Sequence, residues 1–431
     1  MIGEEYSSSN SEELEEDYNS SGIAALANMS NFSEHMAKRM REIAIERLAD
    51  HITTTASVYI KNAESMTEKE LRIKKGEIDA YTIERQAWHE RVLDQAAEDA
   101  RELSKKLGPP PRIIAMRGEC GAGKTTAVRE KYGDKGIVVD GDVPGAVKPD
   151  YFKDVIKKEA RADLGIELTS SQAHMESTGI CRMHTERLAQ DPEASLLIDK
   201  QLEAKGDIPE IIEWGHRSGK QVELLDNDVP IELSAFRVLK RRIGGADPSI
   251  EFRGVARGFI GIRANRGQML EDIQDQIVSD YSLRAFDPVT KRQVEVVKKV
   301  DGKIVYEPGY EELGRSICMQ DEVSAKNEAD RAENQIITQK YVEEFVSKYF
   351  DESEKAPNWS KEGAAEAREV LGAYVGLGIT LGEALDSKAV GINPDRNLET
   401  GEYIDPQYKE KVVAFARQQR ATSAGLLTNV A

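Results

Sequence analysis

Long hydrophobic runs, clustered cysteines and aromatic residues are all scarce in this chain of 431 residues. No apolar run approaches the roughly 20 residues that a membrane-spanning helix needs, so a membrane protein is not expected. The three cysteines, Cys120, Cys181 and Cys318, have neither metal-site nor disulfide spacing. The chain also begins without a basic segment followed by an apolar one, the pattern of a secretory signal. Together these absences predict a protein of a reducing compartment, the cytoplasm.

Positive charge is in short supply as well. Lys and Arg number 59 against 77 Asp and Glu, which gives a formal net charge of −18. Duplex binding depends on clustered Lys and Arg that neutralise phosphates, so broad nucleic-acid binding is not expected. Residues 1–32 contain no Lys or Arg and are rich in Ser, Asn, Glu and Asp. This composition predicts a disordered acidic tail, with an interaction or export tail as the alternative.

Apolar residues recur at helical spacing over residues 33–108, against a charge-rich background. The pattern predicts a helical arm, built as two helices or a hairpin. One glycine and three prolines, at positions 108–111, end the arm and mark a domain boundary. A charged amphipathic arm of this kind is usually structural, and partner binding is the alternative.

The chain does contain a phosphate-binding pattern, G-x-x-x-x-G-K-[ST], from Gly118 to Thr125 after the apolar run 113–116. Main-chain N–H groups wrap a triphosphate closely in such a loop, and glycines leave room for that approach. Lys124 is expected to reach the β- and γ-phosphates, and the Thr125 hydroxyl to bind Mg²⁺. The predicted nucleotide-binding residues are Gly118, Gly121, Ala122, Gly123, Lys124, Thr125 and Thr126.

Apolar, β-branched runs alternate with helical stretches after this loop. The expected strands of the sheet are residues 113–116, 136–140, 196–199 and 222–226. Such alternation predicts an α/β fold, here a P-loop NTPase kinase core with a mainly parallel sheet over residues 109–312. An Asp-Gly turn between alternating apolar positions predicts a β-hairpin at 294–306. Residues 313–431 are expected to form a C-terminal helical region, with one long helix over 322–350.

The residues after the phosphate loop favour a kinase among P-loop proteins. The GTPase motif Asn-Lys-x-Asp is absent from the sequence. A small-molecule kinase needs a carboxylate near the acceptor hydroxyl and arginines that neutralise the transferred phosphoryl group. Asp140 and Asp142 are expected at the end of the second strand, and a group of arginines follows the fourth. The candidate lid arginines are Arg237, Arg241, Arg242, Arg253, Arg257 and Arg263.

The order of three motifs resembles the zeta-toxin family of P-loop kinases. They are the phosphate loop, the segment Val138-Val139-Asp140-Gly141-Asp142, and the segment Pro149-Asp150-Tyr151. Lys148 stands where that family has a histidine. The resemblance spans roughly residues 109–308. It implies ATP and Mg²⁺ as cofactors, and UDP-N-acetylglucosamine, phosphorylated on the 3′-hydroxyl of its sugar, as the acceptor.

The resemblance also implies roles for individual side chains. Lys124 would stabilise the β/γ-phosphates, Asp142 would be the base for the acceptor hydroxyl, and Glu176 would orient the sugar. Arg241 and Arg257 would neutralise charge in the transition state.

Two further acids join the predicted site. Asp199, at the end of the third expected strand, is a candidate Mg²⁺ partner beside Thr125. Asp140 is assigned to the substrate, with a Mg²⁺ group or a structural cap as alternatives.

Several alternatives stay open at this point. Asp142 in a simple turn, Glu176 on a solvated helix face, and Arg242 or Arg253 in place of the chosen arginines would each fit the sequence. The segment 199–201 departs from the family's Glu-Gly-Thr, which leaves the acceptor open among nucleotide sugars and other small molecules. A nucleotide-hydrolysing switch and a non-catalytic nucleotide-binding protein are the alternative functions. The kinase prediction also leaves open whether a protein inhibitor or antitoxin holds the chain.

Overall fold

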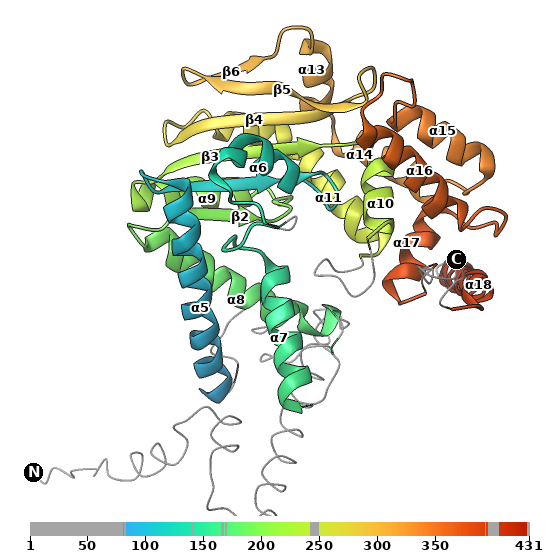
Figure 1. Ribbon diagram of the computed structural model, residues 1–431, viewed down its shortest axis with the longest axis horizontal. Helices are drawn as coiled ribbons and strands as arrows, with labels where there is room; N and C mark the ends of the chain where they lie inside the picture. Colours follow the sequence, from blue (N-terminus) through green and yellow to red (C-terminus); the bar gives the residue numbers. More distant parts are fainter. Residues whose placement is uncertain are drawn as a thin grey trace, which may run out of the picture. The chain divides into compact units, whose positions relative to one another are not determined.

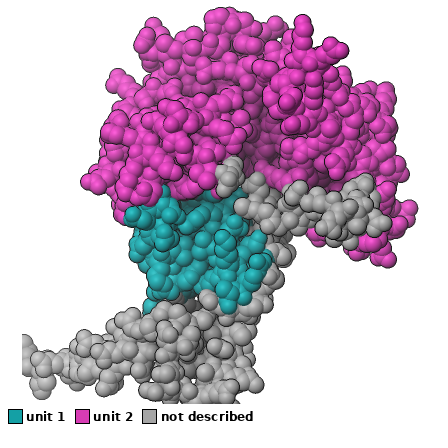
Figure 2. Space-filling view, viewed as in Figure 1, with its two compact units in different colours: residues 1–99, 148–187 teal, residues 100–147, 188–431 magenta. Residues whose placement is uncertain are grey.

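The computed structural model describes residues 81, 83–139, 142–164, 168, 170–241, 250–392, 394 and 405–428. The expected acidic tail, most of the helical arm, Asp140 and Arg242 lie outside the described residues. The chain divides into two compact units, one of residues 1–99 and 148–187, the other of residues 100–147 and 188–431 (Figure 2). The predicted domain boundaries near residues 32, 108 and 312 stay predictions.

The second unit contains a six-stranded sheet of order β2-β1-β3-β4-β5-β6 (Figure 1). The strands are β1 Arg112–Arg117, β2 Leu196–Asp199, β3 Gln221–Asp228, β4 Val278–Asp287, β5 Arg292–Val300 and β6 Lys303–Tyr306. The four strands β2, β1, β3 and β4 pair in parallel, whereas β5 and β6 are antiparallel additions. The prediction of an α/β fold with a mainly parallel sheet is therefore confirmed.

Strand β1 occupies the position in this sheet that brings other strand ends to the phosphate loop. It pairs with β2 on one side and β3 on the other, with Met116 opposite Asp199 and Arg117 opposite Asp226. The carboxyl ends of parallel strands meet at one edge of a sheet, where α/β proteins place their ligands. The loop after Arg117 thus starts between the ends of β2 and β3, which both end in an aspartate.

The described part of the expected second strand, residues 136–139, is not part of the sheet, so the prediction of a strand there is wrong. Instead Val139 and Asp142 form an isolated bridge, with Val139 N to Asp142 O at 2.8 Å. Ile137 and Val143 are buried among the apolar residues that pack on α6 Lys124–Tyr132 and the sheet. On the outer edge of β2, Val147 forms an isolated parallel β-bridge with Ile198. The apolar run therefore covers a face of the sheet and does not extend it.

Helices account for most of the remaining described chain (Figure 1). Besides α6 they are α5 Ile83–Leu107, α7 Pro149–Leu164, α8 Ser170–Gln190, α9 Asp207–Ser218, α10 Ile231–Leu239, α11 Phe252–Ala264, α12 Arg266–Asp272, α13 Glu311–Cys318, α14 Glu322–Glu333, α15 Gln339–Tyr349, α16 Asn358–Gly372, α17 Leu381–Ala389 and α18 Tyr408–Thr428. The predicted C-terminal helical region is confirmed. Among the described residues, no helix is long and apolar enough to cross a membrane.

The hairpin prediction is confirmed, and the strand before it was missed. Asp301 and Gly302 have φ angles of 50° and 76°, the positive values that a two-residue turn with the twist of a hairpin requires. Strand β4 was not predicted, because its residues are buried on both faces and lack a clear two-residue alternation.

The long helix expected over 322–350 is two helices, so that prediction is wrong. Between α14 and α15 the chain extends to pair with the segment before α17, with Ile337 N to Ile379 O at 3.0 Å. Thr338 then starts α15 by accepting a hydrogen bond from the Tyr341 N–H. The predicted apolar face holds for Ile337, Tyr341, Phe345 and Tyr349, whereas Ile336 is 50% exposed.

Candidate nucleotide-binding site

The phosphate loop joins β1 to α6 and is built on three glycines with positive φ angles. Gly118, Gly121 and Gly123 have φ of 148°, 88° and 89°. An added Cβ would lie 2.9 Å from Asn227 O at Gly118, and 2.7 Å from Ser234 O at Gly121. Glycine is thus required here by the close approach of β3 and α10 as well as by the backbone conformation.

Three side chains from outside the loop hold three successive loop carbonyls. The Ser234 hydroxyl donates to Cys120 O, Arg237 Nη1 donates to Gly121 O at 2.9 Å, and Gln293 Nε2 donates to Ala122 O at 2.9 Å. With its carbonyls bound in this way, the loop is fixed in shape. The first N–H groups of α6 have no acceptor within their own helix, and such a helix start favours anions.

Lys124 lies between the loop and the end of β2. Its Nζ donates to Gly118 O at 2.9 Å and lies 3.8 Å from Asp199 Oδ1. Thr125 follows it as the second residue of α6 and is half-buried, and Thr126 is exposed. The structure therefore brings two predicted site residues, Lys124 and Asp199, together beside the loop.

The donor set at this place fits a magnesium ion that is held partly by phosphate oxygens. Mg²⁺ is usually bound by one or two protein oxygens together with substrate phosphates and water. Thr125 and Asp199 supply oxygens of that kind. No cluster of three or more His, Cys, Asp or Glu side chains suited to a metal ion occurs in the part of the chain that the structure describes.

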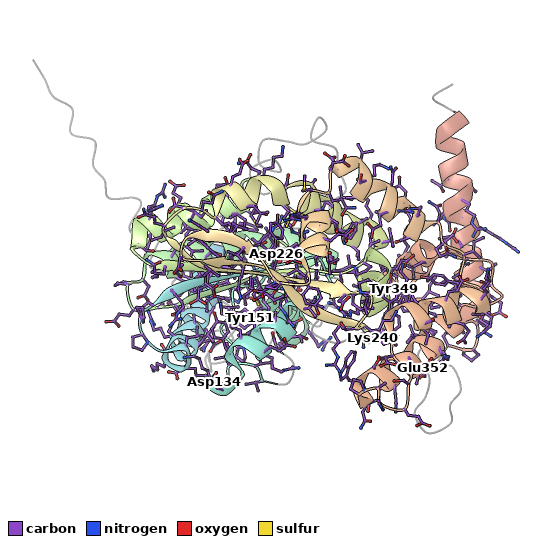
Figure 3. All side chains as sticks on the ribbon, turned by 90° about the horizontal axis from the view of Figure 1, so that it is seen from above. Asp134, Tyr151, Asp226, Lys240, Tyr349 and Glu352 are labelled. Atoms are coloured by element: carbon purple, nitrogen blue, oxygen red, sulfur yellow. The ribbon has the colours of Figure 1, made fainter. Side chains whose placement is uncertain are left out.

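A buried network of three arginines and two aspartates lies directly behind the loop. Arg117 Nη1 lies 3.1 Å and Arg266 Nε 2.9 Å from Asp226 Oδ2. Arg266 Nη1 also contacts Asp228 Oδ2 at 2.9 Å, and Arg263 Nη2 contacts Asp228 Oδ1 at 2.7 Å. Asp226 lies within the layer of the sheet (Figure 3). This arginine–aspartate network, Arg117, Asp226, Asp228, Arg263 and Arg266, was not predicted.

The charges of the network balance one another in the protein interior. Burial tends to raise the pKa of the Asp228 carboxyl, but Arg263 and Arg266 outweigh it and hold that pKa below its usual range. Arg263 also reaches α14, where its Nη1 donates to Glu328 Oε2 at 2.8 Å. A buried charge is tolerated only when it is paired, so the network fixes the end of β3 behind the loop.

Glu119, the second residue of the loop, is buried beside this network. It is 1% exposed, and its Oε1 has no hydrogen-bond partner among the described residues. Burial, followed by the negative charge of Asp228, raises the pKa of the Glu119 carboxyl to about 7. The sequence pattern treats this position as variable and gave no signal for it.

Asp142 lies in a tight turn and not at the end of a strand. Its N–H donates to Val139 O at 2.9 Å, and its own Oδ1 accepts from Val143 N at 2.7 Å. Val143 is buried against the sheet near α6, and Val147 pairs with β2, whose last residue is Asp199. These contacts fix the backbone on either side of the half-buried Asp142.

The predicted lid arginines separate into different environments. Arg241 is half-buried after α10, and its carbonyl accepts from Lys388 Nζ. Arg257 lies on α11 with 71% of its side chain exposed, 3.5 Å from Glu203. Arg263 belongs to the arginine–aspartate network, and Arg237 of α10 binds a carbonyl of the loop. Neither arginine has the environment of a mobile lid residue.

Glu176 belongs to the other unit, where it is buried between helices. Its Oε1 lies 2.5 Å from Arg85 Nε and 2.7 Å from His89 Nε2, both on α5. Arg85 Nη1 also contacts Glu159 of α7 at 2.6 Å. The alternative of Glu176 on a solvated helix face is therefore wrong, because Glu176 is buried and accepts from two donors of α5.

Ser234 and Gln293 were not predicted as site residues, and Arg237 was predicted as a lid arginine but holds the loop. Ser234 and Arg237 are three residues apart on α10, a spacing that places both on one helix face. This spacing is the one sequence signal that could have linked them. Gln293 comes from β5, and nothing in its neighbourhood links it to a loop about 170 positions earlier.

Comparison with models of known protein families gives no match, and comparison with curated proteins gives none either. Solved structures do match. A chain of the crystal structure of AvrRxo1-ORF1:-ORF2 in its native form is 26% identical with a TM-score of 0.63, and the alignment covers 75% of this chain and 94% of that one. The form with sulphate ions is 25% identical with a TM-score of 0.61 and coverages of 73% and 92%.

A third match is the crystal structure of AvrRxo1-ORF1:-ORF2 with ATP. It is 24% identical, with a TM-score of 0.63 and coverages of 76% and 96%. The chain therefore shares its fold with nearly the whole length of a chain of that complex.

Proposed function

We propose that the protein is an ATP-dependent kinase that transfers the γ-phosphoryl group to a hydroxyl of a small molecule. The observation that supports this most strongly is the fixed phosphate loop, with Lys124 beside Asp199 at its mouth. The protein also shares its fold with a chain of the AvrRxo1-ORF1:-ORF2 complex, which was solved with ATP. A zeta-toxin-like kinase, as the order of the motifs suggests, fits these observations.

In this proposal Lys124 moves from the Gly118 carbonyl to the β- and γ-phosphates when ATP binds. The N–H groups of the loop and of the start of α6 would hold phosphate oxygens, and Thr125 and Asp199 are the residues that would hold Mg²⁺. The ion would neutralise part of the phosphate charge. Asp142 accepts the proton of the acceptor hydroxyl as that oxygen attacks. The chain contributes positioning and charge neutralisation, and no covalent intermediate is needed.

The acceptor in this proposal is a nucleotide sugar such as UDP-N-acetylglucosamine. The support is the motif order from the phosphate loop through Asp142 to Tyr151. Asp140 and Glu176 are the residues proposed to bind the acceptor molecule. To contact the sugar, Glu176 would have to give up its contacts with Arg85 and His89. Arg241 and Arg257 are the proposed lid arginines.

Product mass spectrometry tests the proposal. The protein is incubated with ATP, Mg²⁺ and a panel of nucleotide sugars, and the masses of the products are compared. We expect one added phosphate on a nucleotide sugar, and loss of this product in Lys124→Ala. Asp142→Asn is expected to lower the rate by about 10²–10⁴-fold, the usual contribution of a general base.

Asp134→Asn is the matched control, because Asp134 is an exposed acid just after α6. It is expected to leave the rate unchanged. Release of ADP and inorganic phosphate with no phosphorylated product would favour the nucleotide-hydrolysing switch. ATP binding that survives Lys124→Ala, without turnover, would favour a non-catalytic protein.

We also propose a protein partner, because the matched solved structures are complexes of two proteins. An inhibitor or antitoxin of this kind is expected to lower ATP consumption at a stoichiometric ratio to the kinase. Unchanged turnover at saturating partner would contradict this role.

A further inference from the structure

Glu119 is an acid placed where the proposed function puts the phosphates of ATP. It follows Gly118 directly, lies five residues before Lys124, and is 1% exposed. Helix α11 closes over it, because a Cβ added to Gly258 would lie 3.3 Å from Glu119 Cβ. Its Oε1 receives no hydrogen bond from any described residue. The donor that faces this carboxyl is its own backbone N–H, and a carboxylate is rarely buried with so few donors.

Charged groups of both signs surround Glu119 from every element packed on it. Asp228 of β3 is the nearby negative group, and the positive groups are Lys124 of α6, Arg263 of α11 and Arg237 of α10. Arg263 is already bound to Asp228, and Arg237 to Gly121 O. Gln201, from the turn after β2, is the neutral neighbour, and its Nε2 lies 2.9 Å from Cys120 Sγ. Lys124 is thus the one of these cations whose side chain changes partner in the proposed complex.

Bound ATP would place several negative charges near Glu119 and would draw the Lys124 side chain toward the phosphates. A second anion close to a buried carboxyl disfavours its ionised form. The free protein is already close to the balance point, since the pKa of Glu119 is raised to about 7. Ionised Glu119 and bound triphosphate therefore oppose each other.

We propose that ATP binding is linked to the uptake of one proton by Glu119, so that the carboxyl is neutral whenever the loop holds a triphosphate. The proton comes from the solvent when ATP binds and returns to it when the nucleotide leaves. The inference rests on the proposed binding of ATP at this loop. It makes Glu119 a positioning residue that tunes nucleotide affinity with pH.

Isothermal titration calorimetry with Mg²⁺ and ATP at pH 8 measures the linkage, in two buffers with different ionisation enthalpies. The terminal phosphate, with a pKa near 6, is fully ionised there and contributes no proton. About 0.9 proton per ATP is expected for the wild type, because a group with a pKa near 7 is mostly ionised at pH 8. Between pH 6.5 and 8.5 the dissociation constant should rise about 20- to 25-fold.

Glu119→Gln mimics the neutral carboxyl, so its proton uptake and its pH dependence should both vanish. Asp386→Asn is the matched control. Burial raises the pKa of the Asp386 carboxyl to about 6, but this residue belongs to α17 and bonds the Phe252 N–H. The control variant should keep the full uptake.

Two results would overturn the inference: ATP binding without proton uptake, or equal uptake in Glu119→Gln and the wild type. Failure of the wild type to bind ATP would overturn the proposed function and the inference together. Should Glu119→Gln not fold, infrared difference spectroscopy of the wild type decides the matter. A protonated-carboxyl band must then appear when ATP is added.

Discussion

A single carboxyl inside the phosphate loop has consequences for stability as well as for binding. Glu119 ionises near pH 4.5 in the unfolded chain, whereas its pKa in the folded protein is raised to about 7. The folded state therefore holds the proton more tightly than the unfolded state does. The contribution of Glu119 to the free energy of unfolding is fully present below pH 4.5. It decreases as the pH rises from 4.5 to 7 and does not change further above pH 7.

Glu119→Gln is accordingly expected to stabilise the protein at pH 8 by as much as about 3 kcal/mol, and to leave stability unchanged near pH 4. The physical reason is that the variant removes the cost of ionising a buried group. Denaturant unfolding at both pH values measures the difference. A variant less stable than the wild type at pH 8 would show that the ionised carboxyl has a stabilising partner.

The glycines and the Lys124-Thr125 pair of the loop were predictable, whereas the contacts that hold the loop in shape were not. Glycine spacing and the Lys124-Thr125 pair are local features that the chemistry of phosphate binding requires. The donors Arg237 and Gln293 reach the loop only after the sheet has formed. Their role depends on strand order, which no local pattern encodes.

At the scale of elements, periodicity identified the strands with a clear apolar signal. Strands β1, β2 and β3, together with the β5–β6 hairpin, were predicted near their observed positions. The run at 136–140 has the same composition as a strand. Its Val139 pairs with Asp142 only three residues later, so the run turns back on itself. Apolar composition alone cannot tell a strand in the sheet from a segment that covers its face.

Buried lysines hold several element ends in place, and Lys299 of β5 shows this most fully. Its Nζ donates to Ile273 O at 2.7 Å, Asp275 O at 2.8 Å and Val278 O at 2.6 Å. These carbonyls lie between the end of α12 and the start of β4. Lys299 therefore joins the β5 strand to the turn that precedes β4.

Lys299→Ala should destabilise the protein by about 3 kcal/mol, because buried carbonyls lose their donor. Lys303→Ala, at an exposed position of β6, is the matched control and should shift stability by less than about 0.5 kcal/mol. Urea unfolding of both variants makes the comparison. Equal stabilities would mean that water replaces the ammonium group.

At the scale of the whole molecule, the C-terminal helices are part of the structure that supports the loop. One apolar core contains residues of α10 and α11 together with residues of α14 to α18. Phe345 of α15 packs on Phe236 of α10, with ring centroids 5.2 Å apart. Tyr349, seen among these helices in Figure 3, donates to Glu232 Oε2 of α10 at 2.6 Å. Helix α10 in turn carries the Ser234 and Arg237 side chains that hold the loop.

Phe345→Ala is therefore expected to lower the stability of the loop region along with that of the C-terminal helices. The loss should be about 3–5 kcal/mol, as for other large buried side chains. Calorimetry in the presence and absence of ATP follows the unfolding of the loop region and of the C-terminal helices. We expect the unfolding transition that ATP stabilises to move to lower temperature in the variant. An unchanged ATP-stabilised transition would mean that the loop region does not depend on the C-terminal helices for its stability.

The fate of the γ-phosphoryl group tests the central claim most directly. The protein is given ATP labelled in that group, with Mg²⁺ and UDP-N-acetylglucosamine, and the label is followed by chromatography beside Lys124→Ala. A kinase of the proposed kind transfers the label to an organic product, and the variant does not. Label found only in inorganic phosphate, at the same rate with and without acceptor, would contradict it.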